Sequence, residues 1–65
     1  MNKDIWKIDY KTIRAHVADR HIKKRLLRIK NSAVSNTYFF KGEAMGWDID
    51  CHLDKLKFAG KILAG

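Results

Sequence analysis

The fold of this chain is decided by the stretch Thr12-Ile-Arg-Ala-His-Val-Ala-Asp-Arg-His-Ile-Lys-Lys-Arg-Leu-Leu-Arg-Ile-Lys-Asn31. In and just before this stretch, two sets of apolar residues recur at helical spacing. The first is Tyr10, Ile13 and Val17, and the second is Ile22, Leu26 and Ile29. At about 100° per residue the second apolar stripe lies nearly opposite the first, so one continuous helix would have to bury two opposite faces. A break at Ala18–Asp19, with Asp19 as N-cap, resolves this conflict. The pattern predicts two helices, over residues 10–18 and 20–31.

The second of these helices is strongly basic. Between Arg20 and Lys30 the sequence has six Lys/Arg and no acid. The formal net charge of +7 lies entirely in residues 1–31, which contain ten Lys/Arg and three Asp, whereas residues 32–65 are neutral. Clustering of one sign is typical of a protein that binds the phosphate backbone of nucleic acid. The alternative is a solvated helix face that only keeps a small protein soluble.

The remaining segments predict strands and one more helix. Residues 5–10 alternate as in a short strand, and residues 47–53 alternate strictly over seven positions. Together with the strand-favouring residues 37–40 and the glycines Gly42 and Gly46, the second alternation predicts a β-hairpin. After Asp54, a C-terminal helix places Leu56, Ala59, Ile62 and Leu63 on one face.

Length and composition limit the class of protein. Sixty-five residues predict a single domain over 1–65 with a small core. The lone Cys51 fits a reducing compartment, no apolar run approaches the length of a membrane span, and residues 1–6 have no apolar segment of a signal peptide. We therefore expect a cytoplasmic protein without a membrane partner.

The order helix, turn, basic helix, hairpin resembles winged helix-turn-helix domains. Residues 12–31 look like their helix pair, and residues 34–51 look like the wing. The resemblance implies an α+β fold with a short strand, two helices, a β-hairpin wing and a C-terminal helix. A second resemblance, to small helix-turn-helix modules of phages and mobile elements, competes with it, because there a helix begins at Ser35 and replaces the hairpin. The strict alternation after Trp47 favours the wing.

This resemblance implies duplex DNA as the partner. A small transcriptional regulator or recombination accessory factor of phage or mobile-element type would place the helix from Arg20 to Lys30 in the major groove. Its binding to DNA would be either sequence-specific or architectural. The implied DNA-binding residues are Lys11, Arg14, Arg20, His21, Lys23, Lys24, Arg28, Lys30 and, at the hairpin tip, Lys41.

Catalysis and cofactors are not expected. Cys51 and His52 are adjacent and lack the spacing of paired metal ligands, so no metal site is predicted. Asp48 and Asp50 share one face of a strand without a predicted pocket or nucleophile, so we expect no enzyme.

Two other function classes remain open. The aromatic residues allow RNA or single-stranded nucleic acid as the ligand. An exposed patch of Leu27, Phe58 and Leu63 would instead favour a small inhibitor or adaptor that docks on another protein. The C-terminal helix is the candidate interface of a homodimer, unless it packs back on its own domain and leaves a monomer.

Overall fold

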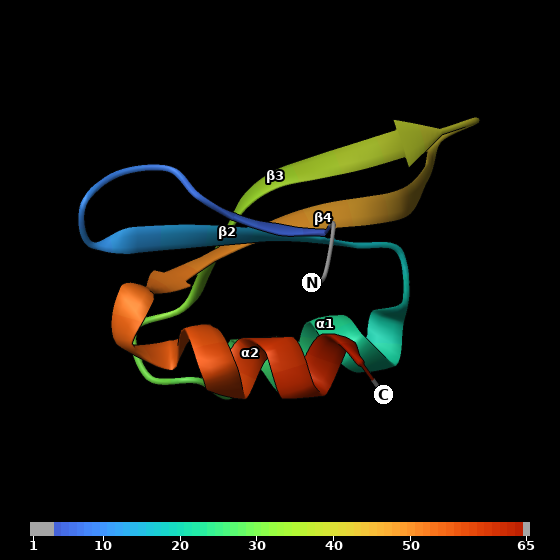
Figure 1. Cartoon of the computed structure of the whole chain (residues 1–65). Coiled ribbons are helices and arrows are strands. Elements are labelled where there is room, and N and C mark those ends of the chain that lie inside the picture. The colour runs from blue at the N-terminus through green and yellow to red at the C-terminus, as the bar shows by residue number, and fades with distance from the viewer. Residues whose placement is uncertain (1–3, 65) are drawn as a thin grey trace.

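The computed structural model describes residues 4–64. An antiparallel sheet of four strands, in the order β1-β2-β4-β3, forms one layer, and two helices pack under one of its faces (Figure 1). The chain is therefore a small α+β domain, as the sequence predicts. In chain order the elements are β1 (Ile5–Lys7), β2 (Thr12–Val17), α1 (Arg20–Leu27), β3 (Ala33–Phe40), β4 (Glu43–His52), the 3-10 helix η1 (Leu53–Lys55) and α2 (Leu56–Leu63).

The helix predicted over residues 10–18 is wrong, because this segment contains strand β2. Ile13, Ala15 and Val17 are buried and the residues between them face the other side of the sheet, which is the period of a strand. Ile13 and Val17 also fit a helix, so the local pattern allows both structures. Pairing with β1 on one side and β4 on the other decides for the strand. The helix-turn-helix pair therefore lacks its first helix.

Helix α1 begins where the sequence predicts. The side chain of Asp19 accepts hydrogen bonds from the backbone N–H groups of His21 (2.7 Å) and Ile22 (3.2 Å). Leu26 is buried against the sheet, as the apolar stripe predicts. The helix ends at Leu27, earlier than predicted, and the chain turns through Asn31, whose φ of 66° is left-handed.

The β3–β4 hairpin is confirmed and is longer than predicted. Its two-residue turn, Lys41-Gly42, has φ of 53° and 82°, and positive φ at both positions is typical of a type I′ turn. Ser35 lies inside β3, so the competing helix that begins at this residue is wrong. All of β3 is exposed, and Figure 1 shows the hairpin tip extending beyond the helices.

Helix α2 completes the core and packs on its own domain. Ala59 and Ile62 are buried, whereas Leu56 and Phe58 are exposed. Most of the apolar stripe that the sequence analysis names as the candidate dimer interface therefore packs within the domain. The buried core consists of Ile13, Ala15, Val17, Leu26, Ile29, Trp47, Ile49, Cys51, Ala59 and Ile62.

We expect Asp19→Ala to lower the free energy of unfolding by about 1 kcal/mol, because the first turn of α1 loses its capping acceptor. Urea denaturation followed by circular dichroism measures this change. Asp19→Asn is the matched control, since it removes the charge and keeps a good N-cap. An Asn variant as unstable as the Ala variant would show that the charge of Asp19, and not its cap, is what stabilises the helix.

Candidate nucleic-acid interface

The outer side of α1 carries a row of exposed cations. Arg20, Lys24 and Arg28 are spaced four residues apart and so lie on one side of the helix, opposite the buried Leu26. His21 and Arg25 are exposed beside this row. The amphipathic pattern read from the sequence therefore predicts the orientation of α1 correctly.

Helix α2 adds further cations to the same layer. It runs antiparallel to α1 and packs beside it (Figure 1). Segments 19–30 and 54–63 together contain nine Lys/Arg against Asp19 and Asp54. Within residues 4–64, none of these nine cations forms an ion pair with a carboxylate. We call this surface the helical layer; its cations are Arg20, Lys23, Lys24, Arg25, Arg28, Lys30, Lys55, Lys57 and Lys61.

Lys23 differs from the other cations of the helical layer. Its ammonium nitrogen lies 4.5 Å from the centroid of the Trp47 ring, and its side chain is half-buried. This cation–π contact covers the edge of the core. Lys23 thus contributes to packing, although the sequence assigns it to the DNA-binding set.

The face of the sheet opposite the helices carries Asp48 and Asp50. Arg14 binds Asp50 through two hydrogen bonds, of 2.7 and 3.1 Å, and this contact raises the pKa of the guanidinium. Because β2 is a strand, Arg14 lies on this face and not beside α1. The structure therefore separates Arg14 from the predicted binding residues of α1.

The buried Asp48 is the centre of a polar network on the same face. It is 4% exposed and interacts with His16 Nδ1 (2.9 Å), Tyr38 Oη (2.6 Å) and Asn36 Nδ2 (3.2 Å). Burial alone would raise the pKa of Asp48, but the hydrogen bonds from Tyr38, His16 and Asn36 outweigh burial and lower it. The imidazole packs over Gly46, where a Cβ would lie 3.4 Å from His16 Cε1, in van der Waals contact. The network orients His16 and satisfies Asp48.

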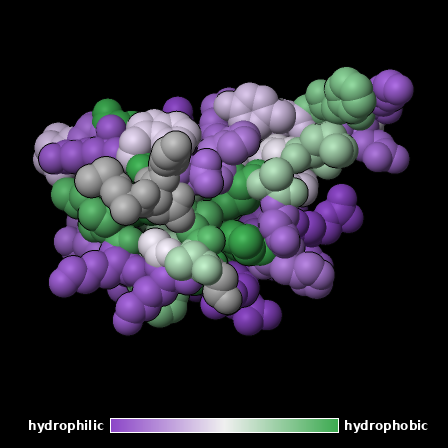
Figure 2. Space-filling model, turned by 45° about the vertical axis from the view of Figure 1, so that its right-hand side comes forward, coloured by the Kyte–Doolittle hydropathy of each residue, from purple (hydrophilic) through white to green (hydrophobic). Residues whose placement is uncertain are grey.

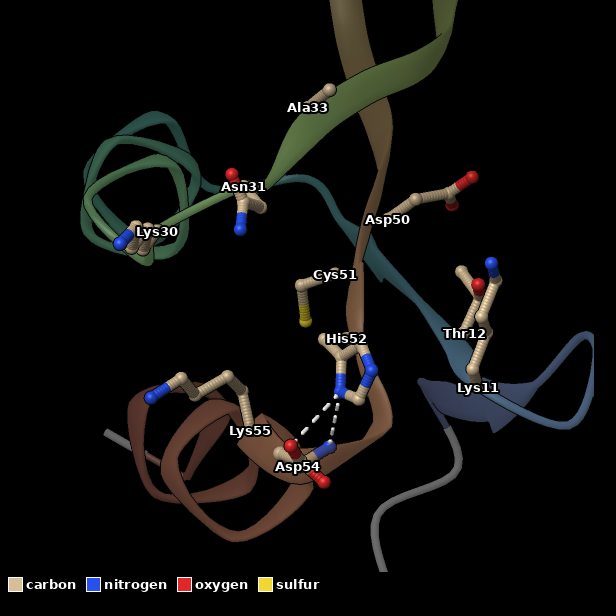
Figure 3. Close-up of a pocket in the computed structure, with 10 residues that line it drawn as sticks. All are labelled: Lys11, Thr12, Lys30, Asn31, Ala33, Asp50, Cys51, His52, Asp54 and Lys55. Atoms are coloured by element: carbon tan, nitrogen blue, oxygen red, sulfur yellow. Dashed lines mark hydrogen bonds and ion pairs between the residues drawn. The ribbon is translucent and has the colours of Figure 1, made fainter.

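A pocket of about 520 Å³ lies at the end of the helical layer where α1 ends and α2 begins (Figure 3). Lys11, Lys30 and Lys55, the last residue of η1, line it together with Asp50 and Asp54. Lys11 extends beside Thr12 and Asp50, away from Lys30 and Lys55, so the structure does not bring the predicted Lys11 and Lys30 together (Figure 3). The sulfur of Cys51 faces the same space. Burial raises the pKa of this thiol, which keeps it protonated at neutral pH and unreactive as a nucleophile.

The other predicted residues fall in two places. Arg20, His21, Lys24 and Arg28 share the helical layer, whereas Lys41 lies at the hairpin tip, away from the helices. Hydrophilic side chains predominate on the lower side of the molecule, where the helices lie (Figure 2). The hairpin tip presents hydrophobic side chains beside hydrophilic ones, and further hydrophobic side chains are visible in the middle of this view. The binding residues predicted from the sequence do not include Arg25, Lys55, Lys57 or Lys61. The last three join the cations of α1 only because α2 packs beside α1, whereas Arg25 lies on α1 itself, next to its apolar stripe.

Other classes of site are sparse in the described part of the chain. Among residues 4–64, no group of three His, Cys, Asp or Glu side chains is arranged to hold a metal ion. Neither of the two described α-helices has the length and apolar composition needed to cross a membrane. Comparison with protein-family models, with curated proteins and with solved structures finds no significant match to this chain.

The Asp48 network predicts a pH-dependent contribution to stability. Because folding lowers the pKa of Asp48, the ionised carboxylate stabilises the fold above pH about 4, and this contribution is lost as pH falls through the lowered value. Asp48→Asn should lower the free energy of unfolding by about 1–3 kcal/mol at pH 7 and by less at pH 3. Urea denaturation at both pH values measures the difference. Glu43→Gln, at an exposed position, is the control, and an equal loss for Asp48→Asn at both pH values would contradict the ionic role.

Proposed function

We propose that this chain binds nucleic acid through the helical layer, whose cations contact the phosphate backbone. One observation carries the proposal: nine of the twelve Lys/Arg side chains without an ion pair among residues 4–64 lie on one layer, while Asp48 and Asp50 lie on the opposite face. A protein that needed charge only for solubility would gain nothing from this separation. A polyanion gains directly from it, because the potential of the layer attracts phosphates and the other face does not.

The mode of binding differs from that of a winged helix-turn-helix domain. That mode needs a first helix across the backbone, and residues 12–17 form β2 instead. Helix α1 has eight residues and so is about 12 Å long. In our proposal α1 and α2 together form the contact surface, with Arg20, Lys24 and Arg28 as the main phosphate ligands. Lys30 and Lys55 extend this surface at the end of the layer, whereas Lys11 lies beside Asp50 and is outside the proposed surface.

The energetics of such an interface are mainly electrostatic. If about five of the cations contact phosphates, log K falls with log salt at a slope of roughly −4 to −5 for a duplex and −3 to −4 for a single strand. The contacts carry no sequence information by themselves. The proposal thus predicts salt-sensitive binding with little preference among sequences.

A second candidate function, binding to another protein, is favoured by the hairpin tip. Phe39, Phe40 and Met45 are each more than half exposed there, and Phe39 and Phe40 end the uncharged edge strand β3. Exposed apolar clusters outside a polar surface mark protein contacts. This surface is separate from the helical layer, so the two functions are compatible and mutations can test them separately.

We expect Lys24→Gln/Arg28→Gln to weaken binding at least tenfold, with a salt slope smaller by about 2, because two phosphate contacts are lost. Fluorescence anisotropy of labelled 20-nucleotide DNA, single-stranded and duplex, measures both quantities. Lys7→Gln/Lys41→Gln removes the same charge from β1 and the hairpin tip and should change affinity less than threefold. Equal losses for the two double variants would show that only net charge matters and would contradict an interface on the helical layer.

A further inference from the structure

Phe58 occupies an unusual position in the helical layer. It is 58% exposed and lies on α2 beside the groove between the two helices. Arg25, Arg28 and Ile62 line a hollow on one side of it, and Arg28, Lys30 and Lys55 are among the residues that line a hollow on the other side. These hollows measure about 190 and 210 Å³. A large apolar ring is thus surrounded by cations.

The fold does not need Phe58 in this place. Ala59 and Ile62 make the buried contacts of α2, and Phe58 is outside the buried core. Its ring is also free of cation–π partners among residues 4–64, where such contacts involve Tyr10, Phe40 and Trp47. A face of the ring is therefore available to a ligand.

The type of ligand follows from what surrounds the ring. Phosphates alone need only the cations, and an aromatic side chain adds little to their binding. A nucleobase offers a flat π-face, but in a duplex that face is covered by the neighbouring base pairs, whereas in a single strand it is accessible. From this chemistry we infer that the groove binds a strand with an unpaired base, which stacks on Phe58 while Arg25, Arg28, Lys30 and Lys55 hold the adjoining phosphates. This inference rests on the proposed function and names its preferred ligand.

Other exposed aromatic residues lack this combination. Phe39 and Phe40 lie at the hairpin tip, where Lys41 is followed closely by Glu43. Tyr38 donates a hydrogen bond from its hydroxyl to Asp48, on the face of the sheet opposite the helices. Among the described residues only Phe58 joins an exposed ring to several cations of the helical layer.

The test compares Phe58→Ala with the unmodified chain on three 12-nucleotide ligands: single-stranded DNA, single-stranded RNA and duplex DNA. Loss of one stacked base should weaken binding to the single strands at least about fivefold and to the duplex less than twofold. Phe40→Ala, which truncates an equally exposed ring at the hairpin tip, should leave all three affinities unchanged. Thermal unfolding verifies that both variants fold. A selective loss on DNA or on RNA identifies which strand the groove prefers.

Phe58→Trp supplies an independent signal. Its indole should preserve single-strand affinity, and its emission should be quenched on binding beyond any change that Trp6 and Trp47 show in the unmodified chain. The stacking inference is overturned if Phe58→Ala leaves salt-sensitive binding unchanged, or weakens it equally for the duplex and the single strands. Either result leaves the proposed function standing. If the protein binds none of the three ligands at low salt, both the stacking inference and the proposed function are overturned. The same conclusion follows if it binds only vesicles that contain phosphatidylserine.

Discussion

The pairing of β2 with β4 is the constraint on which the rest of the structure depends. In one register it places Ile13 opposite Cys51 and Ala15 opposite Ile49 on the buried side. On the other side the same register sets Arg14 against Asp50 and His16 against Asp48. A shift by one residue would turn the apolar residues to solvent and the charges into the core, so the register is strongly specified. A domain of this size buries little apolar surface in total, so it cannot lose these contacts without a large loss of stability.

This register also determines how charge is distributed over the molecule. Because Asp48 and Asp50 find their partners on the open face of the sheet, they are unavailable to neutralise the helices. The cations of the helical layer therefore repel one another in the free protein. In α1 this cost is reduced because Lys24 and Arg25 lie in the last turn, where the helix dipole favours positive charge. A bound polyanion would offset the rest, which links the internal pairing of the sheet to the proposed function of the opposite layer.

The sequence predicts an element correctly where its residue pattern fits only one type of secondary structure. It fails where the same pattern fits both a helix and a strand. Asp19 marks the start of α1, and the strict alternation after Trp47 indicates β4, because each pattern fits only one period. Residues 12–17 fit two periods, and of the two strands that pair with them only β1 is close in sequence, whereas β4 is 30 to 40 residues away. The choice between helix and strand is therefore tertiary. That single error misplaces Arg14. The part of the proposed interface that α2 contributes, Lys57 and Lys61, depends on the packing of two helices whose contact no local pattern encodes.

The packing of α2 explains why Phe58 faces outward. Ala59 is completely buried, and its small side chain lets the helix approach the core closely. Once Ala59 points inward, the residue before it is rotated by about 100° and must leave the core. Phe58 is consequently exposed, whereas Ile62, one turn beyond Ala59 toward the C-terminus, is buried. The rotation of α2 that buries Ala59 therefore also places the Phe58 ring beside the cations of α1. The core and the proposed interface both depend on this one rotation.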